Sequence, residues 1–218
     1  MQIAICCDFD GTITLEDTGK VLLTSLTDKD WQFYDKLVIN GEIGTREALV
    51  NQWGMIEKTS LDEINMLVDK IKIDPTFIDF YNWVKEKNFK FIIVSDGFKS
   101  YINRIFKNHQ IHIPEEDIKA NDMKLIANKI SLDFLTSECS HDCANCKFSH
   151  VQKIKNQNFK IIYIGDGLSD IFPAQRLADV VFAKEEEDLA KVLKDDTRLH
   201  TFSKFTDIIA KMKSMKIV

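Results

Sequence analysis

The chain has 218 residues, of which 44% are hydrophobic and 29% charged, and its formal net charge is −5 at pH 7. This length suits one large domain or a core with a modest insertion, and the negative charge argues against a nucleic-acid-binding protein. No apolar run reaches the ~20 residues that span a bilayer, and the amino terminus turns acidic too early for a signal peptide. We therefore expect a cytoplasmic protein, a monomer or homodimer with no membrane partner, whose five cysteines form no disulfide framework.

Several short apolar runs are predicted to be buried strands. They lie at 3–7, 91–94, 160–164 and, more weakly, 179–183. Continuous runs rich in Ile and Val are typical of parallel strands that are buried on both faces. Helical patterns alternate with these runs and are expected at 76–87, 98–108, 148–156 and 168–177. This alternation predicts an α/β protein with a Rossmann-like, doubly wound parallel sheet.

The segment 14–74 does not alternate in this way. It has the pattern of several helices, with turns near Asn40-Gly41 and Gly44. We predict that it forms a small helical cap inserted after the first strand. The core domain then consists of 1–13 and 75–218.

Acidic residues follow two of the predicted strands. Asp8 and Asp10 come after the first strand, with Thr12 close by, and Asp166 and Asp170 follow the strand at 160–164. The carboxyl ends of parallel strands meet at one edge of a sheet, where such folds bind their ligands. Clustered carboxylates repel each other unless a hard cation lies between them, and Mg²⁺ prefers such oxygen ligands. The sequence therefore predicts a magnesium site formed by these four aspartates.

A third group of polar residues, Ser95, Asp96 and Gly97, follows the strand at 91–94. A hydroxyl and backbone N–H groups near the start of a helix can bind phosphate oxygens. The alternative is an ordinary helix cap. We expect these residues, together with Thr12, to contact a phosphate group.

The segments CDFDGT, VSDG and GDGLSD resemble, in this order, motifs I, II and IV of the haloacid dehalogenase superfamily. The resemblance implies a Mg²⁺-dependent phosphatase acting on a small phosphorylated metabolite. Asp8 is then the nucleophile that forms an aspartyl-phosphate, and also a metal ligand. Asp10 is the general acid and base, with its carbonyl on the metal. Asp166 is a metal ligand, and Asp170 either binds the metal or supports a group that does.

The superfamily also needs a motif III Lys or Arg that pairs with the phosphate and the nucleophile. Lys147 stands at the start of the helix expected at 148–156, shortly before motif IV, and is our candidate. Lys153, Lys155 and Lys124 are rivals.

Lys147 is preceded by four residues with soft metal-binding side chains: Cys139, His141, Cys143 and Cys146. Thiolate and imidazole ligands suit a structural Zn²⁺ ion. A cysteine-rich loop without metal and a redox pair are the alternatives.

This loop and the opening CDFDGTIT resemble the branch that contains 2-hydroxy-3-keto-5-methylthiopentenyl-1-phosphate phosphatase of methionine salvage, which is related to phosphoserine phosphatase. The resemblance implies that the cap selects the substrate, through Asp17 and Arg46, although Gln52 fits the expected arginine position better. Phosphoserine or another small metabolite is an alternative substrate, and transfer to an alcohol an alternative reaction. The alternative of another class is a non-catalytic, regulatory domain that binds a phosphometabolite.

Overall fold

The computed structural model describes residues 2–135, 139 and 141–217. Its centre is a seven-stranded sheet with the order β4-β3-β2-β1-β5-β6-β7. All neighbouring strands are parallel except β4, which is antiparallel to β3. The strands are β1 (Ile3–Cys7), β2 (Lys90–Phe98), β3 (Ile118–Ile126), β4 (Lys129–Asp133), β5 (Lys160–Gly165), β6 (Val180–Lys184) and β7 (Leu199–Phe202). The predicted doubly wound α/β fold is confirmed.

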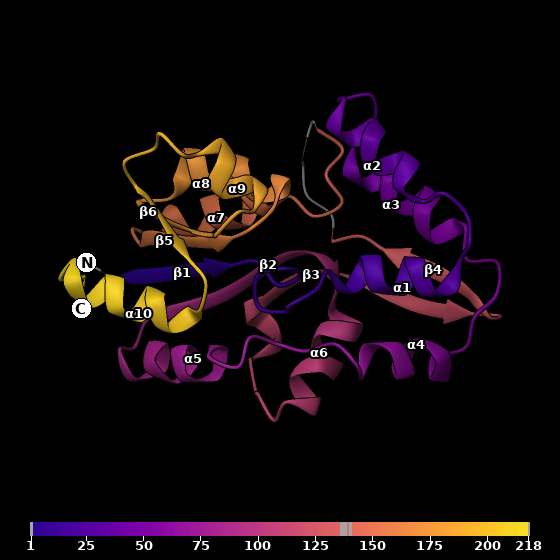
Figure 1. Ribbon diagram of the computed structural model, residues 1–218, viewed down its shortest axis with the longest axis horizontal. Helices are drawn as coiled ribbons and strands as arrows, with labels where there is room; N and C mark the ends of the chain where they lie inside the picture. Colours follow the sequence, from indigo (N-terminus) through magenta and orange to yellow (C-terminus); the bar gives the residue numbers. More distant parts are fainter. Residues whose placement is uncertain (1, 136–138, 140, 218) are drawn as a thin grey trace.

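Helices cover both faces of this sheet (Figure 1). One layer contains α5 (Phe77–Glu86), α6 (Lys99–Asn108) and α10 (Phe205–Ser214). The other contains α7 (Lys147–Lys155), α8 (Ile171–Leu177) and α9 (Asp188–Val192). Each layer has its own apolar core, because the central strands present buried side chains to both faces. None of the helices in the described residues is long and apolar enough to cross a membrane.

The register of the three central strands brings their carboxyl ends together. Cys7 at the end of β1 pairs with Ile93 of β2 on one side and with Ile164 of β5 on the other. The residues that follow each of these positions therefore emerge at one edge of the sheet, which is where the polar motifs of the sequence lie.

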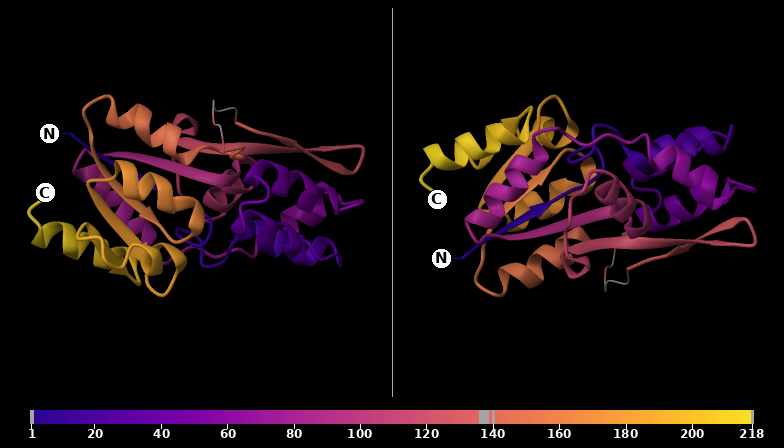
Figure 2. Two further views of the ribbon diagram at one scale, coloured as in Figure 1. Left: turned by 90° about the horizontal axis from the view of Figure 1, so that it is seen from above. Right: turned by 90° about the horizontal axis from the view of Figure 1, so that it is seen from below.

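Four helices lie between β1 and α5: α1 (Thr18–Leu26), α2 (Gln32–Ile39), α3 (Thr45–Gly54) and α4 (Leu61–Val68). Asp17 caps α1 through Lys20 N, and a capping box of Ser60 and Glu63 begins α4. The ends of this segment are side by side, since Thr14 and Ile73 form an isolated antiparallel bridge. Figure 2 shows the long β3–β4 ribbon extending from the core alongside these helices.

Candidate active site

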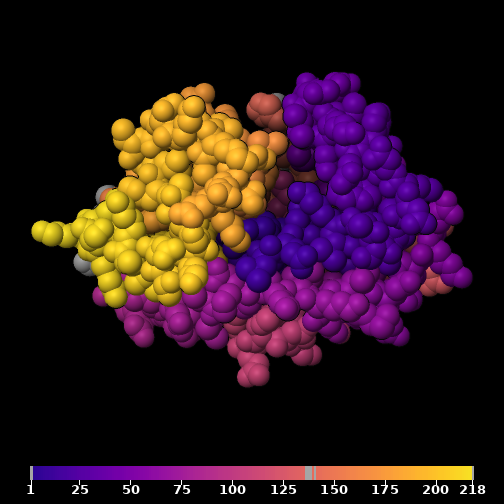
Figure 3. All heavy atoms as spheres, viewed as in Figure 1, coloured from indigo at the N-terminus to yellow at the C-terminus, as the bar shows by residue number. Residues whose placement is uncertain are grey.

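The carboxyl edge of the sheet opens into a cavity of about 400 Å³ between the core and the helices of segment 14–74. Figure 3 shows this face hollowed between the carboxyl-terminal half of the chain and helices α2 and α3. Core residues on the wall include the predicted Asp8, Asp10, Ser95, Asp96, Gly97, Lys147 and Asp166. The structure therefore brings together residues from all four sequence motifs.

Lys147 lies between two aspartates at the base of this site. Its Nζ is 2.7 Å from Asp8 Oδ2 and 2.7 Å from Asp170 Oδ1. All three residues are buried, with at most 6% of each exposed. Burial lowers the pKa of Lys147, but Asp170 and Asp8 more than offset this and raise it, so the ammonium group stays charged. Lys147 thus occupies the position expected of the lysine that pairs with the nucleophile.

Asp170 uses all its acceptor positions within the protein. Its Oδ1 accepts from Lys147 Nζ at 2.7 Å and from Tyr163 OH at 2.7 Å. Its Oδ2 accepts from the backbone N–H groups of Asp166 at 3.0 Å and Gly167 at 3.1 Å. A carboxylate offers about four lone-pair sites. This geometry favours Asp170 as a group that positions Lys147 and the motif IV turn, rather than as a direct metal ligand.

The carboxylates fit a divalent cation. One oxygen from each of Asp8, Asp166 and Asp170 lies within 4.8 Å of the others. Three carboxylates meet one ammonium group, that of Lys147, so this cluster has a net formal charge of −2. Burial and Asp170 raise the pKa of Asp166 to about 7, and burial and Asp170 also raise that of Asp8. This uncompensated negative charge and the carboxylate oxygens of Asp8 and Asp166 suit Mg²⁺, and Asp170 contributes charge rather than a ligand.

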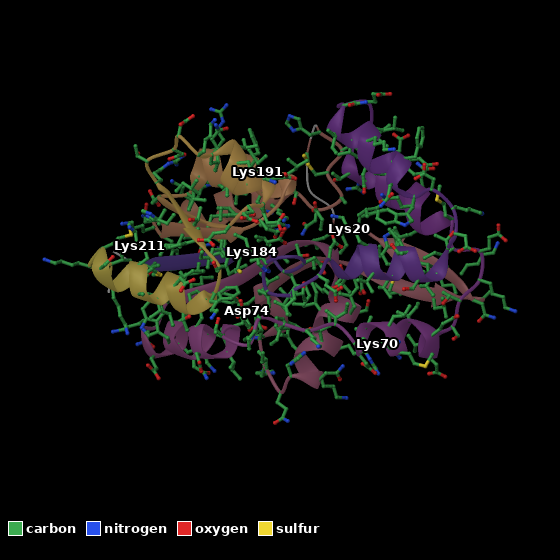
Figure 4. The ribbon with its side chains drawn as sticks, in the orientation of Figure 1. Lys20, Lys70, Asp74, Lys184, Lys191 and Lys211 are labelled. Atoms are coloured by element: carbon green, nitrogen blue, oxygen red, sulfur yellow. The ribbon has the colours of Figure 1, made fainter. Side chains whose placement is uncertain are left out.

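Thr12 is buried beside Asp166 and is not among the residues that line the cavity. Its hydroxyl donates a short hydrogen bond to Asp166 Oδ1. The chain turns tightly at Gly11, whose φ of +79° favours glycine. A Cβ added there would lie 2.5 Å from Asp166 Oδ2, so the turn packs directly against this carboxylate. Lys184 Nζ donates to Gly11 O at 2.9 Å and fixes the same turn (Figure 4). Thr12 is therefore placed to orient a carboxylate, whereas we expected it to contact phosphate.

Asp10 points into the cavity and is held from two sides. Its Oδ1 accepts from the backbone N–H of Thr18 at 3.0 Å, and its Oδ2 accepts from Tyr101 OH at 2.7 Å. Burial and the nearby Asp17 raise its pKa to about 6. Gly97 makes room for this arrangement, since a Cβ there would lie 2.5 Å from Asp10 Oδ2. The first turn of α1 thus helps to position the second aspartate of motif I.

Ser95 and Asp96 line the same cavity from the extended end of β2, and α6 begins only at Lys99. Ser95 Oγ accepts from Gly97 N at 3.0 Å, which leaves its hydroxyl hydrogen available to a ligand. Asp96 Oδ1 is buried and has no hydrogen-bond partner among the described residues, and burial raises the pKa of Asp96 to about 6. Asn145 ties this wall to α7, donating to Ser95 O at 2.8 Å.

The helices of segment 14–74 supply a polar and an apolar part of the wall. Asp17, Lys20 and Asp35 line the cavity with Gln52, whose Nε2 donates to Asp35 Oδ1 at 2.7 Å. Figure 4 labels Lys20 on α1, and its Nζ is 3.4 Å from Asp17 Oδ2. Apolar lining residues are Val38, Ile39, Leu49 and Trp53.

Arg46 lies elsewhere. Its guanidinium contacts Asp142, 3.5 Å from Oδ1, and stacks 4.9 Å from the centroid of the Phe134 ring. It is not among the residues that line the active-site cavity. The structure therefore gives no support to the expected contact between Arg46 and substrate. Gln52, the other residue considered for this contact, does line the cavity.

The predicted soft-ligand residues form a separate cluster beside the site. The sulfur atoms of Cys139, Cys143 and Cys146 lie within 4.8 Å of one another. His141 Nδ1 is 3.8 Å from Cys139 Sγ. Cys146 immediately precedes Lys147, the first residue of α7.

Sequence reasoning missed four residues that support the site: Tyr101, Asn145, Tyr163 and Lys184. Tyr163 lies in an apolar run and Tyr101 on an apolar helix face, and at such positions a tyrosine is interpreted as an ordinary core residue. Asn145 lies within the cysteine-rich run, where only the cysteines and His141 were singled out, and Lys184 lies outside the motifs. Tyr101 and Tyr163 could have been noticed in the sequence, because a tyrosine in a buried segment needs a hydrogen-bond partner for its hydroxyl.

Comparison with known proteins agrees with this geometry. Residues 3–205 match the family described as "Putative Phosphatase". The chain is 31% identical over 229 residues to Polyol phosphate phosphatase PYP1 of Saccharomyces cerevisiae, with 99% of this chain and 94% of that protein covered. It is 27% identical over 217 residues to 2-hydroxy-3-keto-5-methylthiopentenyl-1-phosphate phosphatase of Bacillus cereus, with 98% and 97% covered.

The fold recurs in a solved structure described as the phospho-aspartyl intermediate analogue of phosphoserine phosphatase. The TM-score is 0.73 at 14% identity, with 96% of this chain and 98% of that chain covered. A haloacid dehalogenase family hydrolase of Salmonella enterica gives a TM-score of 0.71 at 18% identity, with 92% and 68% covered. Fold and site together define a phosphatase of the haloacid dehalogenase type, which hydrolyses phosphoric monoesters. The chain belongs to the phosphatase family that its residues 3–205 match.

Proposed function

We propose that this phosphatase hydrolyses a small phosphorylated metabolite with Mg²⁺ through an aspartyl-phosphate on Asp8. The observation that carries the proposal is the convergence of Asp8, Asp10 and Lys147 on one cavity at the carboxyl edge of the sheet. Asp8 is held for attack, because its Oδ1 accepts from Phe9 N at 2.7 Å and its Oδ2 lies 2.7 Å from Lys147 Nζ. A purely binding domain would need neither a fixed carboxylate nucleophile nor a second acid beside it.

The proposed reaction has two steps. A carboxylate oxygen of Asp8 forms a bond to phosphorus as the bond from phosphorus to the substrate oxygen breaks, and Asp10 donates its proton to that leaving oxygen. Asp10 then removes a proton from water, whose oxygen attacks the aspartyl-phosphate and releases phosphate and the Asp8 carboxylate. A pKa of about 6 suits Asp10 to both roles near neutral pH.

The charge that develops on the phosphoryl oxygens must be neutralised. Bound Mg²⁺ would supply positive charge there, held by Asp8, Asp166 and the backbone carbonyl of Asp10. Lys147 adds a fixed positive charge on the same side as Asp8. The Ser95 hydroxyl would donate to one of the remaining phosphoryl oxygens, since its Oγ accepts from Gly97 N and its hydrogen is free for a ligand.

Segment 14–74 is proposed to be the cap that selects the leaving group, with the core formed by 1–13 and 75–218. Its part of the wall has carboxylates and an amide at Asp17, Asp35 and Gln52, and a single cation at Lys20. The carboxylates can accept hydrogen bonds from substrate hydroxyls, and Lys20 can donate to a keto or hydroxyl oxygen. A free substrate carboxylate, as in phosphoserine, would meet repulsion here, because Arg46 points away from the cavity.

This lining favours a hydroxylated, straight-chain phosphate. The apolar side chains of Val38, Ile39 and Leu49 would accommodate an alkyl or thioether end. The methionine-salvage compound 2-hydroxy-3-keto-5-methylthiopentenyl-1-phosphate has both features and is the proposed substrate, and a polyol phosphate is the second candidate. The names of two relatives support these candidates.

Phosphate release from a substrate panel tests the proposal. The panel contains the methionine-salvage compound, glycerol phosphate, sugar phosphates and phosphoserine, each with Mg²⁺ and with a chelator. We expect Asp8→Asn to lose activity on every member while it keeps the wild-type melting temperature within a few degrees. Mass spectrometry of acid-quenched wild type should find a phosphoryl group on Asp8. Turnover by Asp8→Asn near the wild-type rate would refute the mechanism, and preference for phosphoserine would refute the substrate assignment.

A further inference from the structure

The segment between β4 and α7 holds a sulfur cluster that phosphate hydrolysis does not use. Cys139 Sγ is 3.3 Å from Cys143 Sγ, and the sulfur atoms of these two residues and Cys146 all lie within 4.8 Å of one another. His141 Nδ1 lies beside this group, 3.8 Å from Cys139 Sγ. Ligands at ~2.3 Å from a tetrahedral zinc ion are about 3.8 Å apart. Sulfur atoms in a disulfide are only about 2.05 Å apart. The sulfur separations are therefore too long for a disulfide and lie within about 1 Å of the spacing of zinc ligands.

The cluster is also accessible to an ion. Its three cysteines and His141 line a second cavity, of about 690 Å³, which adjoins the active site through Asp96 and Lys147. Cys139 and Cys143 are only partly buried, whereas Cys146 is buried at the inner end. A metal site needs an entry path, and the cavity beside the two partly exposed cysteines provides one.

We propose that Cys139, His141, Cys143 and Cys146 bind one structural Zn²⁺ ion, and that this zinc knuckle latches α3 to the helix that begins with Lys147. Three thiolates and one imidazole are a common set for structural zinc, and a closed set of four leaves no position for substrate. The site is distinct from the carboxylate site, which offers oxygen donors alone.

The latch consists of contacts between the knuckle and the start of α3. Ala144 N donates to Thr45 Oγ1 at 2.9 Å, and Arg46 N donates to Asp142 O at 3.1 Å. Gly44 packs so closely that a Cβ there would lie 2.5 Å from Asp142 Cβ. Arg46 adds its ion pair with Asp142. Arg46 therefore stabilises the contact between cap and knuckle rather than binding substrate.

On the other side, the knuckle ends at Cys146, whose carbonyl accepts from Ser149 N at 3.0 Å in the first turn of α7. Fixing Cys146 to a metal fixes the backbone that carries Lys147. It also fixes Asn145, which bonds to the carbonyl groups of Ser95 and Lys119, both at 2.8 Å. Zinc would thus hold one wall of the active site and the cap in a single arrangement.

The test measures metal rather than activity. Protein purified with Zn²⁺ and dialysed should contain one zinc per chain, and Cys139→Ser and Cys143→Ser should each reduce this from about one to below about 0.1. Cys6→Ala, a cysteine substitution in β1 outside the cluster, should keep the full amount, and Asp166→Asn should keep it as well. With Co²⁺ in place of Zn²⁺, we expect thiolate-to-cobalt charge-transfer absorption that is lost in Cys143→Ser.

Hydrogen exchange tests the latch. Removal of zinc should speed exchange at the start of α3 and the first turn of α7, and leave the centre of β1 unchanged. A Cys139–Cys143 disulfide in the isolated protein, a cobalt spectrum without thiolate absorption, or zinc that disappears only in Asp166→Asn would overturn the proposal. Zinc content, cobalt absorption and hydrogen exchange do not depend on the phosphatase reaction. A failure of the zinc proposal can therefore be distinguished from a failure of the proposed function.

Discussion

Replacing Lys147 with methionine removes the one cation between Asp8 and Asp170 and keeps a side chain of similar length. Lys147 is 4% exposed and makes two ion pairs of 2.7 Å. Removing one partner of a buried pair typically costs about 3–5 kcal/mol, because the remaining charge is left without compensation. For a protein of this size, 1 kcal/mol shifts the melting temperature by about 2–4 °C. The metal-free variant should therefore melt about 6–20 °C lower than wild type.

Catalysis should suffer separately. Loss of one preorganised donor to the transition state costs about 10²–10³ in rate, and Lys147→Met should lose this much in phosphate release. Mg²⁺ should restore part of the melting temperature, because it neutralises the same carboxylates, but it should not restore the rate. Lys153→Met is the matched control, since Lys153 is an exposed lysine on the same helix. Activity of Lys147→Met within about threefold of wild type would refute the assigned role of Lys147.

Three further predictions concern Asp10 and the metal site. Asp10→Asn should slow hydrolysis of alkyl phosphates far more than that of p-nitrophenyl phosphate, whose leaving group needs no proton; equal losses in the two assays would contradict its role as acid. Tyr101→Phe removes a 2.7 Å hydrogen bond that lowers the pKa of Asp10, so the profile of rate against pH should move to higher pH, and an unmoved profile would count against this link. Finally, the pKa of Asp166 is raised to about 7, so protons compete with Mg²⁺ below that pH. The melting-temperature gain from Mg²⁺ should grow from about pH 5.5 to about pH 8, and a gain independent of pH would argue against carboxylate binding.

The central strands could be predicted because they are buried on both faces. The runs of β1, β2 and β5 are continuous and apolar, and parallel pairing brings the residues after them to one edge. That reasoning predicted the meeting of Asp8 with Asp166, which the structure places within one cluster. The β3–β4 ribbon was missed because it is partly exposed and charged, with the sequences IKANDMKLI and KISLD, and β7 has only four residues.

Side-chain roles were harder to predict than strand ends. Arg46 has the charge expected for a substrate contact, but its position on α3 turns it toward Asp142, and only three-dimensional packing decides this. Tyr101 gave no motif, since its hydroxyl partner, Asp10, is 91 positions away in the sequence. Tyr163 is only 7 positions from its partner, Asp170, but it lies inside the apolar run of β5 and resembles an ordinary core residue. Hydrogen bonds between distant segments depend on register, which one sequence does not specify.

The bridge between Thr14 and Ile73 has a consequence for how this enzyme type could diversify. Leu15 N donates to Lys72 O at 2.9 Å, and Asp74 N donates to Ile13 O at 2.8 Å, so the chain leaves the core and returns to it at one point. Insertions or deletions between these two positions leave the spacing of the sheet strands unchanged. Natural variation or engineering could therefore exchange segment 14–74, which we propose selects the substrate, for one of different size and leave the core of the enzyme unchanged.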